Sequence, residues 1–152
     1  METPGPVPAT PPLLVRRAVP ACEQHVVRLL GEASVDPAEV AGLVRQRAVL
    51  VLSDVTLPPS APPVAAAAFR LDRRAASVEL VGIAVAAPLR RRGLGRRLLT
   101  GALMLLRAEG FERVGARAVP GGATASLLAS AGFADDGDTA RAGGRGRFLL
   151  VL

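Results

Sequence analysis

The sequence is short of the residues on which several kinds of site depend. Its 152 residues include one cysteine, Cys22, and one histidine, His25. One cysteine excludes an intrachain disulfide and a metal cluster built on cysteines, and one histidine leaves no histidine pair for a metal. The chain has no tyrosine, which removes a common catalytic acid, and all of its 19 basic residues are arginine. The absence of lysine excludes the phosphate loop that requires Gly-Lys-Ser/Thr.

Long apolar runs are also missing. The longest, LLTGALMLL at 98–106, is far shorter than the ~20 residues that a membrane helix needs. The opening stretch METPGPVPATPP has neither the basic start nor the apolar core of a signal peptide. We therefore expect a cytoplasmic protein with no membrane contact, and a disordered proline-rich tail over residues 1–12.

The net charge is +6, and all of the basic side chains that contribute to it are arginines. Arginine keeps its charge in every environment and binds phosphate through a planar fork of donors. A basic balance permits anionic partners such as nucleotides or nucleic acid, but it does not choose between them.

Hydrophobic periodicity divides the chain into alternating strands and helices. Strands are expected at 13–19, 48–54, 64–72, 76–85, 111–119, 133–138 and 145–152, and helices at 20–33, from Pro37 behind the N-cap Asp36, from Gly93 to the C-cap Gly110, and at 122–132. The order β α α β β β α β α β β predicts one α/β domain over residues 13–152. Its mixed, α+β-like sheet would have about six to seven strands, with helices on both faces.

One stretch, PLRRRGLGRRLL at 88–99, lies where a strand ends and the long apolar helix begins. Backbone N–H groups at a helix N-terminus lack helical partners, and the helix dipole is positive there, so such a turn binds phosphate. Gly93 and Gly95 let a ligand approach the backbone closely. A dinucleotide fingerprint would need a third glycine where Leu98 stands. The plainer alternative is a solvated arginine run that caps a helix.

Residues Arg90–Gly95 resemble the signature of the GNAT superfamily of N-acetyltransferases, Arg/Gln-x-x-Gly-x-Gly/Ala. The preceding ELVGIAV is similar to the family's fourth strand, and the order of elements matches from residue 13 to residue 152. The resemblance implies acetyl-CoA as the cofactor, with a strand backbone along the pantetheine arm and the turn around the pyrophosphate. The cofactor-binding residues that it implies are Ile83, Ala84, Val85, Arg90, Arg91, Arg92, Gly93, Leu94, Gly95 and Arg96.

The resemblance also implies a catalytic base. Glu79 stands eleven residues before Arg90, where many GNAT enzymes carry a strand glutamate that acts as a base, often through water. Strand alternation predicts that Glu79 shares a face with Val81, Ile83 and Val85. The alternative is a structural ion pair with an arginine such as Arg73 or Arg74.

Two positions depart from the family pattern. The tyrosine that many members carry five residues before the phenylalanine of a Gly-Phe pair is Leu128 here, and an asparagine seven residues earlier is Gly121. Ser126 or Ser130 could return a proton to the thiolate, although small serines in an alanine-rich helix are typical packing residues. Cys22 and His25 have the i, i+3 spacing of a contact, but a buried thiol is the better interpretation.

The sequence thus predicts an acetyl-CoA-dependent N-acetyltransferase, in which a primary amine attacks directly within a ternary complex. One alternative is an acyl-CoA-binding sensor or regulatory protein of the same fold. A second is a basic nucleic-acid-binding module, which the lack of tyrosine and tryptophan for stacking disfavours. The acceptor stays open among a protein N-terminus, a lysine side chain, an amino acid, a polyamine and an amine drug, and so does a homodimer.

Overall fold

The computed structural model describes residues 12–119, 121–135 and 146–152. The strands are β1 (Leu13–Arg17), β2 (Val49–Asp54), β3 (Ala65–Asp72), β4 (Ser77–Val85), β5 (Arg113–Ala118), β6 (Ala134–Asp135) and β7 (Gly146–Val151). The helices are α1 (Glu23–Gly31), α2 (Pro37–Arg45), α3 (Leu94–Ala108) and α4 (Ala123–Ser130), with short 3-10 turns η1 (Pro20–Cys22) and η2 (Ala87–Leu89). The predicted order of strands and helices is confirmed.

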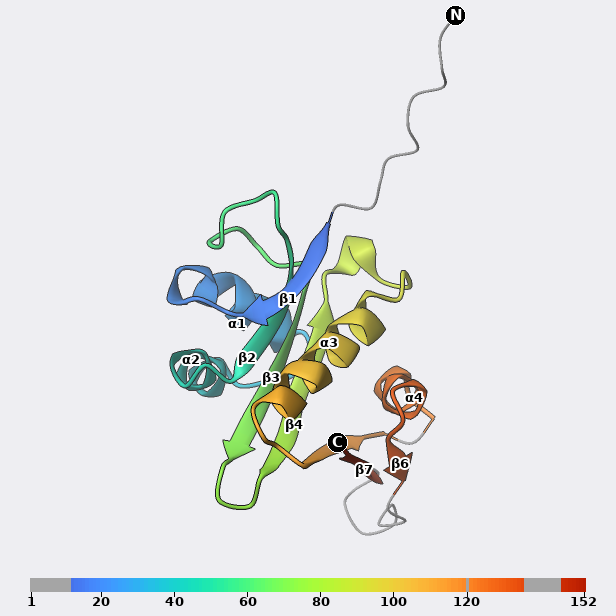
Figure 1. The fold of residues 1–152 in the computed structure, drawn as a ribbon. Helices are drawn as coiled ribbons and strands as arrows, with labels where there is room; N and C mark the ends of the chain where they lie inside the picture. The colour runs from blue at the N-terminus through green and yellow to red at the C-terminus, as the bar shows by residue number, and fades with distance from the viewer. Residues whose placement is uncertain (1–11, 120, 136–145) are drawn as a thin grey trace, which may run out of the picture.

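The strands form one mixed sheet in the order β1-β2-β3-β4-β5-β7-β6. The pairs from β1 to β4 are antiparallel, β4 and β5 run parallel, and β7 lies antiparallel to both β5 and β6. Helices α1 and α2 cover one face and α3 and α4 the other (Figure 1). The prediction of a mixed α/β sheet with helices on both faces is therefore confirmed.

Two apolar layers hold the helices to the sheet. Residues 65–69 of β3 are wholly buried, because helices cover both of their faces, and four of these five are alanines that let both helix layers approach closely. On the α3 side, Leu98, Leu99 and Ala102 have no exposed surface. The predicted C-cap of this helix, Gly110, has the left-handed φ of 96° that a helix end favours.

A β-bulge in β4 alters which side chains share a face. Ala68 pairs with Gly82 while Phe69 pairs with Leu80, so Val81 is an extra residue without a partner. Ile83 and Val85 consequently pack against the α3 layer, whereas Val81 packs against the α1–α2 layer. Because Val78 and Leu80 on either side of Glu79 point toward α3, Glu79 faces the α1–α2 side. The prediction that Glu79 shares a face with Ile83 and Val85 is wrong, because simple alternation ignores the bulge.

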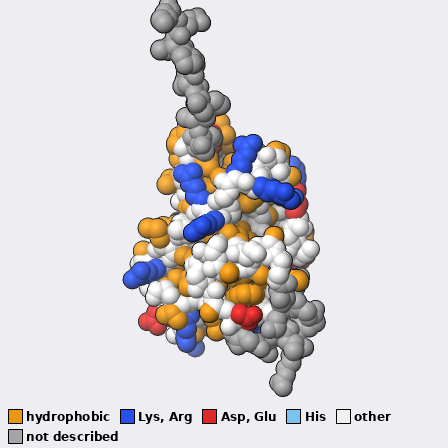
Figure 2. Space-filling model, turned by 90° about the vertical axis from the view of Figure 1, so that its right-hand side faces the viewer, with side chains coloured by type: hydrophobic (Ala, Val, Ile, Leu, Met, Phe, Trp, Pro, Cys, Tyr) orange, Lys and Arg blue, Asp and Glu red, His pale blue; other side chains and the backbone are white. Residues whose placement is uncertain are grey.

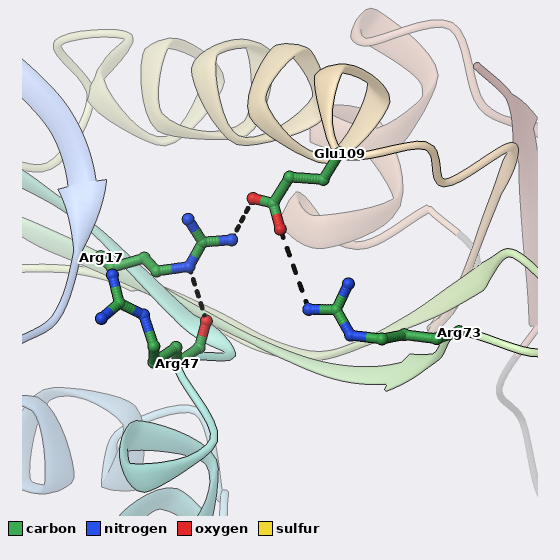
Figure 3. A network of polar contacts seen from close by, with 4 residues as sticks. All are labelled: Arg17, Arg47, Arg73 and Glu109. Carbon is green, nitrogen blue, oxygen red and sulfur yellow. Dashed lines mark hydrogen bonds and ion pairs between the residues drawn. The ribbon is translucent and has the colours of Figure 1, made fainter.

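A network of polar contacts lies at the end of the sheet where α3 terminates (Figure 3). Arg17 forms an ion pair with Glu109 through Nη2, and its Nε donates a 2.9 Å hydrogen bond to the carbonyl oxygen of Arg47. Arg73 approaches the other oxygen of Glu109 at 4.0 Å, and its guanidinium lies 5.4 Å from the centre of the Phe111 ring. The network joins β1, the α2–β2 connection and the β3–β4 hairpin to the end of α3.

Three smaller expectations concern the N-terminal tail, the start of α2 and membrane-spanning helices. The tail predicted over residues 1–12 lies outside the described residues except for Pro12, whose carbonyl oxygen accepts a hydrogen bond from the Val55 N–H. Asp36 precedes α2 as predicted, but its side chain makes no capping hydrogen bond. Within the described ranges, no helix combines the length and hydropathy needed to cross a bilayer.

Candidate functional site

The parallel strands β4 and β5 separate part of the way along their length. They pair only where Ser77–Leu80 lies beside Arg113–Ala116, although β4 continues to Val85. A cavity of about 300 Å³ fills the gap between them, and we call it the splay cavity. It is lined by Ala33, Leu80, Val81, Gly82, Ile83, Arg117, Ala118, Val119, Gly122, Ala123 and Thr124.

The β4 edge beside this gap carries backbone groups that the sheet does not use. The N–H of Ala86 donates to the carbonyl oxygen of Val64, so alternate residues of β4, including Ala84, turn their backbone groups toward β3. The backbone groups of Ile83 and Val85 therefore point toward the gap. Of the three strand residues implied by the resemblance, Ile83 and Val85 turn their backbone groups toward the gap, and those of Ala84 point away from it.

The turn between β4 and α3 brings bare N–H groups to the same end of the gap. Arg91 and Gly93 have left-handed φ angles of 66° and 73°, which wrap the backbone around the start of the helix. None of the N–H groups of residues 91–96 donates a backbone hydrogen bond to a described residue, and the first to do so is that of Arg97, which reaches the carbonyl oxygen of Gly93 at 3.0 Å. The turn therefore has the open donors and the dipole of an anion site.

Side chains fix this turn against the strand and leave its rim basic. Leu94 is buried in the core under α3, and a Cβ built on Gly95 would lie 3.5 Å from both Val85 Cγ2 and Leu127 Cδ2. Figure 2 shows basic side chains gathered in the upper half of the α3–α4 side, the end at which α3 begins in Figure 1. The exposed arginines of this turn and first helical turn are Arg91, Arg92, Arg96 and Arg97.

Arg90 is also exposed, but its side chain points back toward the protein. Its Nε donates to the carbonyl oxygen of Val85 at 3.1 Å, and its Nη2 pairs with Glu32 Oε2 at 2.7 Å. Among the motif residues, Arg90 thus ties the turn to the end of β4 and to the chain after α1.

Glu79 lies on the other face of the sheet from the turn, next to the splay cavity. Its neighbour Leu80 lines that cavity, while Glu79 itself lines an adjacent cavity of about 420 Å³. The carboxylate is half-buried over Gly115, where an added Cβ would lie 3.0 Å from Glu79 Oε2. The alternative ion pair with Arg73 is not formed, since Arg73 approaches Glu109, and no described contact joins Glu79 to Arg74.

Ser126 and Ser130, considered above as proton donors, do not line the splay cavity. Ser130 Oγ donates a 2.7 Å hydrogen bond to the carbonyl oxygen of Leu127 in its own helix. Leu128, which stands where many family members have a tyrosine, has no exposed surface. Thr124 lines the splay cavity instead. The sequence carries no signal for Thr124, because only the separation of β4 from β5 places the start of α4 at the gap.

Arg117, which no motif in the sequence singles out, also lines the splay cavity, from β5. The interpretation of Cys22 as a buried thiol is confirmed, since it is 1% exposed and its Sγ lies 3.2 Å from the carbonyl oxygen of Val19. In the described part of the chain, no three His, Cys, Asp or Glu side chains are grouped to hold a metal ion.

Comparisons with known proteins agree with this arrangement. The model of the acetyltransferase (GNAT) family matches residues 45–133, which include the β4–α3 turn. No curated protein sequence matches the chain.

Many solved structures share the fold. Ard1 from Thermoplasma volcanium has a TM-score of 0.74 at 15% identity, over 92% of this chain and 97% of that one. The ribosomal-protein-alanine N-acetyltransferase from Brucella melitensis has a TM-score of 0.69 at 21% identity, over 91% and 99%. N-acetylglutamate synthase from Neisseria gonorrhoeae, complexed with coenzyme A and N-acetyl-glutamate, has a TM-score of 0.71 at 16% identity, over 92% and 35%.

Proposed function

The chain belongs to the acetyltransferase (GNAT) family, and from that membership we propose that it is an acetyl-CoA-dependent N-acetyltransferase. In this proposal a primary amine attacks directly within a ternary complex. The observation that carries it is the position of the bare helix N-terminus at the end of an unpaired strand edge. One element suits a pyrophosphate and the other an extended amide-containing arm, and the splay cavity lies beside that edge.

The residues at the site fit coenzyme A in both shape and chemistry. Six N–H groups, of residues 91–96, are available to phosphate oxygens, and Gly93 leaves open space because no atom lies within 4 Å of its Cβ position. The exposed arginines at the rim would add charge-assisted contacts. Ile83 and Val85 would pair with the amides of the pantetheine arm. The bound cofactor supplies an acetyl thioester that an amine can attack.

Glu79 is the proposed base. An alkylamine with an ordinary pKa near 10.4 is neutral in only about one molecule per thousand at pH 7, so a proton must be removed before attack. Glu79 faces the α1–α2 side, so an amine entering from that side would meet its carboxylate directly or through water. Unpaired N–H groups on the β4 edge would stabilise negative charge that develops on the substrate oxygen.

A second candidate function follows from Leu128. That position is wholly buried and apolar, so it supplies no proton to a leaving thiolate. An enzyme can still work without that acid, because a thiol has an ordinary pKa near 8.5 and leaves as a thiolate at modest cost. The same feature favours an acyl-CoA-binding sensor or regulatory protein as the alternative.

The test is turnover of acetyl-CoA with a panel of amines by the wild type, Glu79→Gln and Glu112→Gln. Glu112 is exposed and its side chain has no described partner, so it is a matched control for loss of one carboxylate. We expect Glu79→Gln to lower kcat by about a hundredfold with an unchanged Kd for acetyl-CoA. Unchanged turnover would remove Glu79 as the base. Tight acetyl-CoA binding with no turnover of any amine would favour the sensor.

A further inference from the structure

The splay cavity has one charged wall residue. Among the described residues that line it, Arg117 alone carries a charge, and the rest are apolar, glycine or Thr124. Arg117 is exposed and makes no hydrogen bond or ion pair with a described residue. An unpartnered guanidinium at the rim of an otherwise uncharged cavity is available to a ligand. Its charge and its planar set of donors indicate which chemical group that ligand carries.

Strand alternation places Arg117 on the side away from the arginine–glycine turn. Ala116 and Ala118 are buried in the layer under α3 and α4, so Arg117 between them faces the α1–α2 side. Ala33, from the chain after α1, lines the same cavity from that side. Gly115 has the same orientation and lies opposite Glu79, which brings the proposed base and Arg117 to one face of the sheet.

The charges on this face do not favour a polycation. Arg147 is the register partner of Arg117, and the adjacent cavity is lined by Arg70, Arg113 and Arg147 as well as by Asp72 and Glu79. Arg70 is paired with Glu39, and the remaining arginines together with Arg117 still outnumber the two carboxylates, which works against a polyamine or a lysine-rich segment. A guanidinium instead binds a carboxylate through two parallel hydrogen bonds, which orients the bound molecule as well as holding it.

We infer that the acceptor is a primary amine that also carries a carboxylate, and that Arg117 binds this carboxylate at the α1–α2 mouth of the splay cavity. The inference rests on the proposed function and narrows its acceptor. Two kinds of acceptor carry both an amine and such a carboxylate, namely a free amino acid and a peptide whose first residue is acidic. The inference disfavours polyamines and cationic amine drugs. In this inference Arg117 determines which acceptor is preferred, while Glu79 removes the proton from the acceptor amine.

The experiment compares matched acceptors on the full-length chain. The free amino acid arm pairs L-glutamate with L-glutamine and L-alanine with L-alaninamide, and the peptide arm pairs an N-terminal Glu peptide with its Gln counterpart. Each is measured with the wild type, Arg117→Gln and Arg74→Gln. Arg74 is exposed in the β3–β4 hairpin with no described partner, so it controls for loss of one positive charge. Taking the ratio of variant to wild type for each acceptor cancels the differences in amine pKa.

We expect Arg117→Gln to raise KM about ten- to a hundredfold for each acceptor whose carboxylate is bound, with little change in kcat and little change for the amide partner. Arg117→Lys should recover part of the loss, because it keeps the charge but not the fork. Titration of the carboxylated acceptor in the absence of acetyl-CoA should show the same loss in Kd. The arm that responds identifies the source of the carboxylate.

Three results would overturn the inference. The first is equal wild-type efficiency on the two members of every pair, and the second is a loss by Arg117→Gln that is equal for the two members of every pair. The third is faster acetylation of a polyamine such as spermidine. In each of these the proposed function stands, since acetyl-CoA binds and an amine is acetylated. Failure of the wild type to bind acetyl-CoA would instead overturn the proposed function and the inference with it. Circular dichroism of Arg117→Gln verifies that the variant is folded.

Discussion

The contact between α3 and β1 leads to a quantitative prediction at Gly101. A Cβ built on this glycine would lie 2.5 Å from Val15 Cγ2 and 3.0 Å from Val15 Cβ. Rotation of the valine side chain can move Cγ2 but not Cβ, which is attached to the backbone of β1. Gly101→Ala therefore forces the helix and the edge strand apart.

The magnitude is a difference between two opposing effects. Alanine is more favourable than glycine inside a helix by about 1 kcal/mol. Overpacking a tight contact costs about 1–3 kcal/mol, and the upper part of that range applies here because backbone must move. We expect Gly101→Ala to lower the free energy of unfolding by about 1–2 kcal/mol, which corresponds to a fall in Tm of about 2–8 °C for a chain of this size.

The assay is urea denaturation followed by far-ultraviolet circular dichroism, because the chain has neither tryptophan nor tyrosine for fluorescence. Gly42→Ala in α2 is the matched control, since its Cβ would have no atom within 4 Å. We expect that substitution to stabilise the protein by about 1 kcal/mol. Adding Val15→Ala should cost less in the Gly101→Ala background than in the wild type. If Gly101→Ala stabilises the protein as much as Gly42→Ala does, the close approach of α3 to β1 is refuted.

Three further substitutions test other contacts. Glu109→Gln should lower the free energy of unfolding, measured in urea, by about 1 kcal/mol, because each side chain of its ion pair with Arg17 is only a quarter exposed. The loss should be smaller at high salt, which screens the pair. A loss that does not depend on salt would argue against a contribution from this ion pair. The Thr56 hydroxyl donates to Asp54 Oδ1 at 2.6 Å and, with the Thr56 backbone N–H, holds the pKa of Asp54 below its ordinary value of 3.8. Thr56→Val should raise that pKa in an NMR titration, and the stability that the bond contributes above pH 3.8 should be lost as the pH falls through the lowered folded-state pKa; an unmoved pKa would exclude the bond. Arg90→Gln should weaken acetyl-CoA binding about tenfold in a titration without unfolding the protein, because the turn loses its ties to the strand and to α1; unchanged binding would show that these ties do not order the turn.

The β4–α3 turn could be predicted because its signals are local. The motif is contiguous from Arg90 to Gly95, and the helix behind it has regular apolar spacing that begins with Leu94. The order of strands and helices was predictable for the same reason, since each element carries its own periodicity and its own ends. Gly110 marks such an end, and the structure gives it the expected left-handed conformation.

The orientation of Glu79 could not be predicted, because it depends on the register between two strands. The bulge at Val81 exists only where β3 and β4 pair, and it reverses every side chain that follows. The place of Arg117 at the cavity could not be predicted for a related reason. Its outward orientation is visible in the alternation of RVGARA, but the cavity that it lines forms where β5 leaves β4 after Leu80.

The most direct test of the account is a calorimetric titration with acetyl-CoA of the wild type, Gly93→Glu and Gly110→Glu. Both glycines have positive φ and open space at the Cβ position, and they lie at opposite ends of α3, so the two variants match in strain and charge. We predict about micromolar binding by the wild type and Gly110→Glu, and a loss of about a hundredfold or more in Gly93→Glu, whose carboxylate would repel the pyrophosphate. Absence of binding by the wild type, or equal binding by all three proteins, would contradict the account. Without wild-type binding, the turn would be only a basic helix cap, and an anion- or nucleic-acid-binding role would replace the enzyme. With equal binding, the pyrophosphate would lie elsewhere than at the β4–α3 turn.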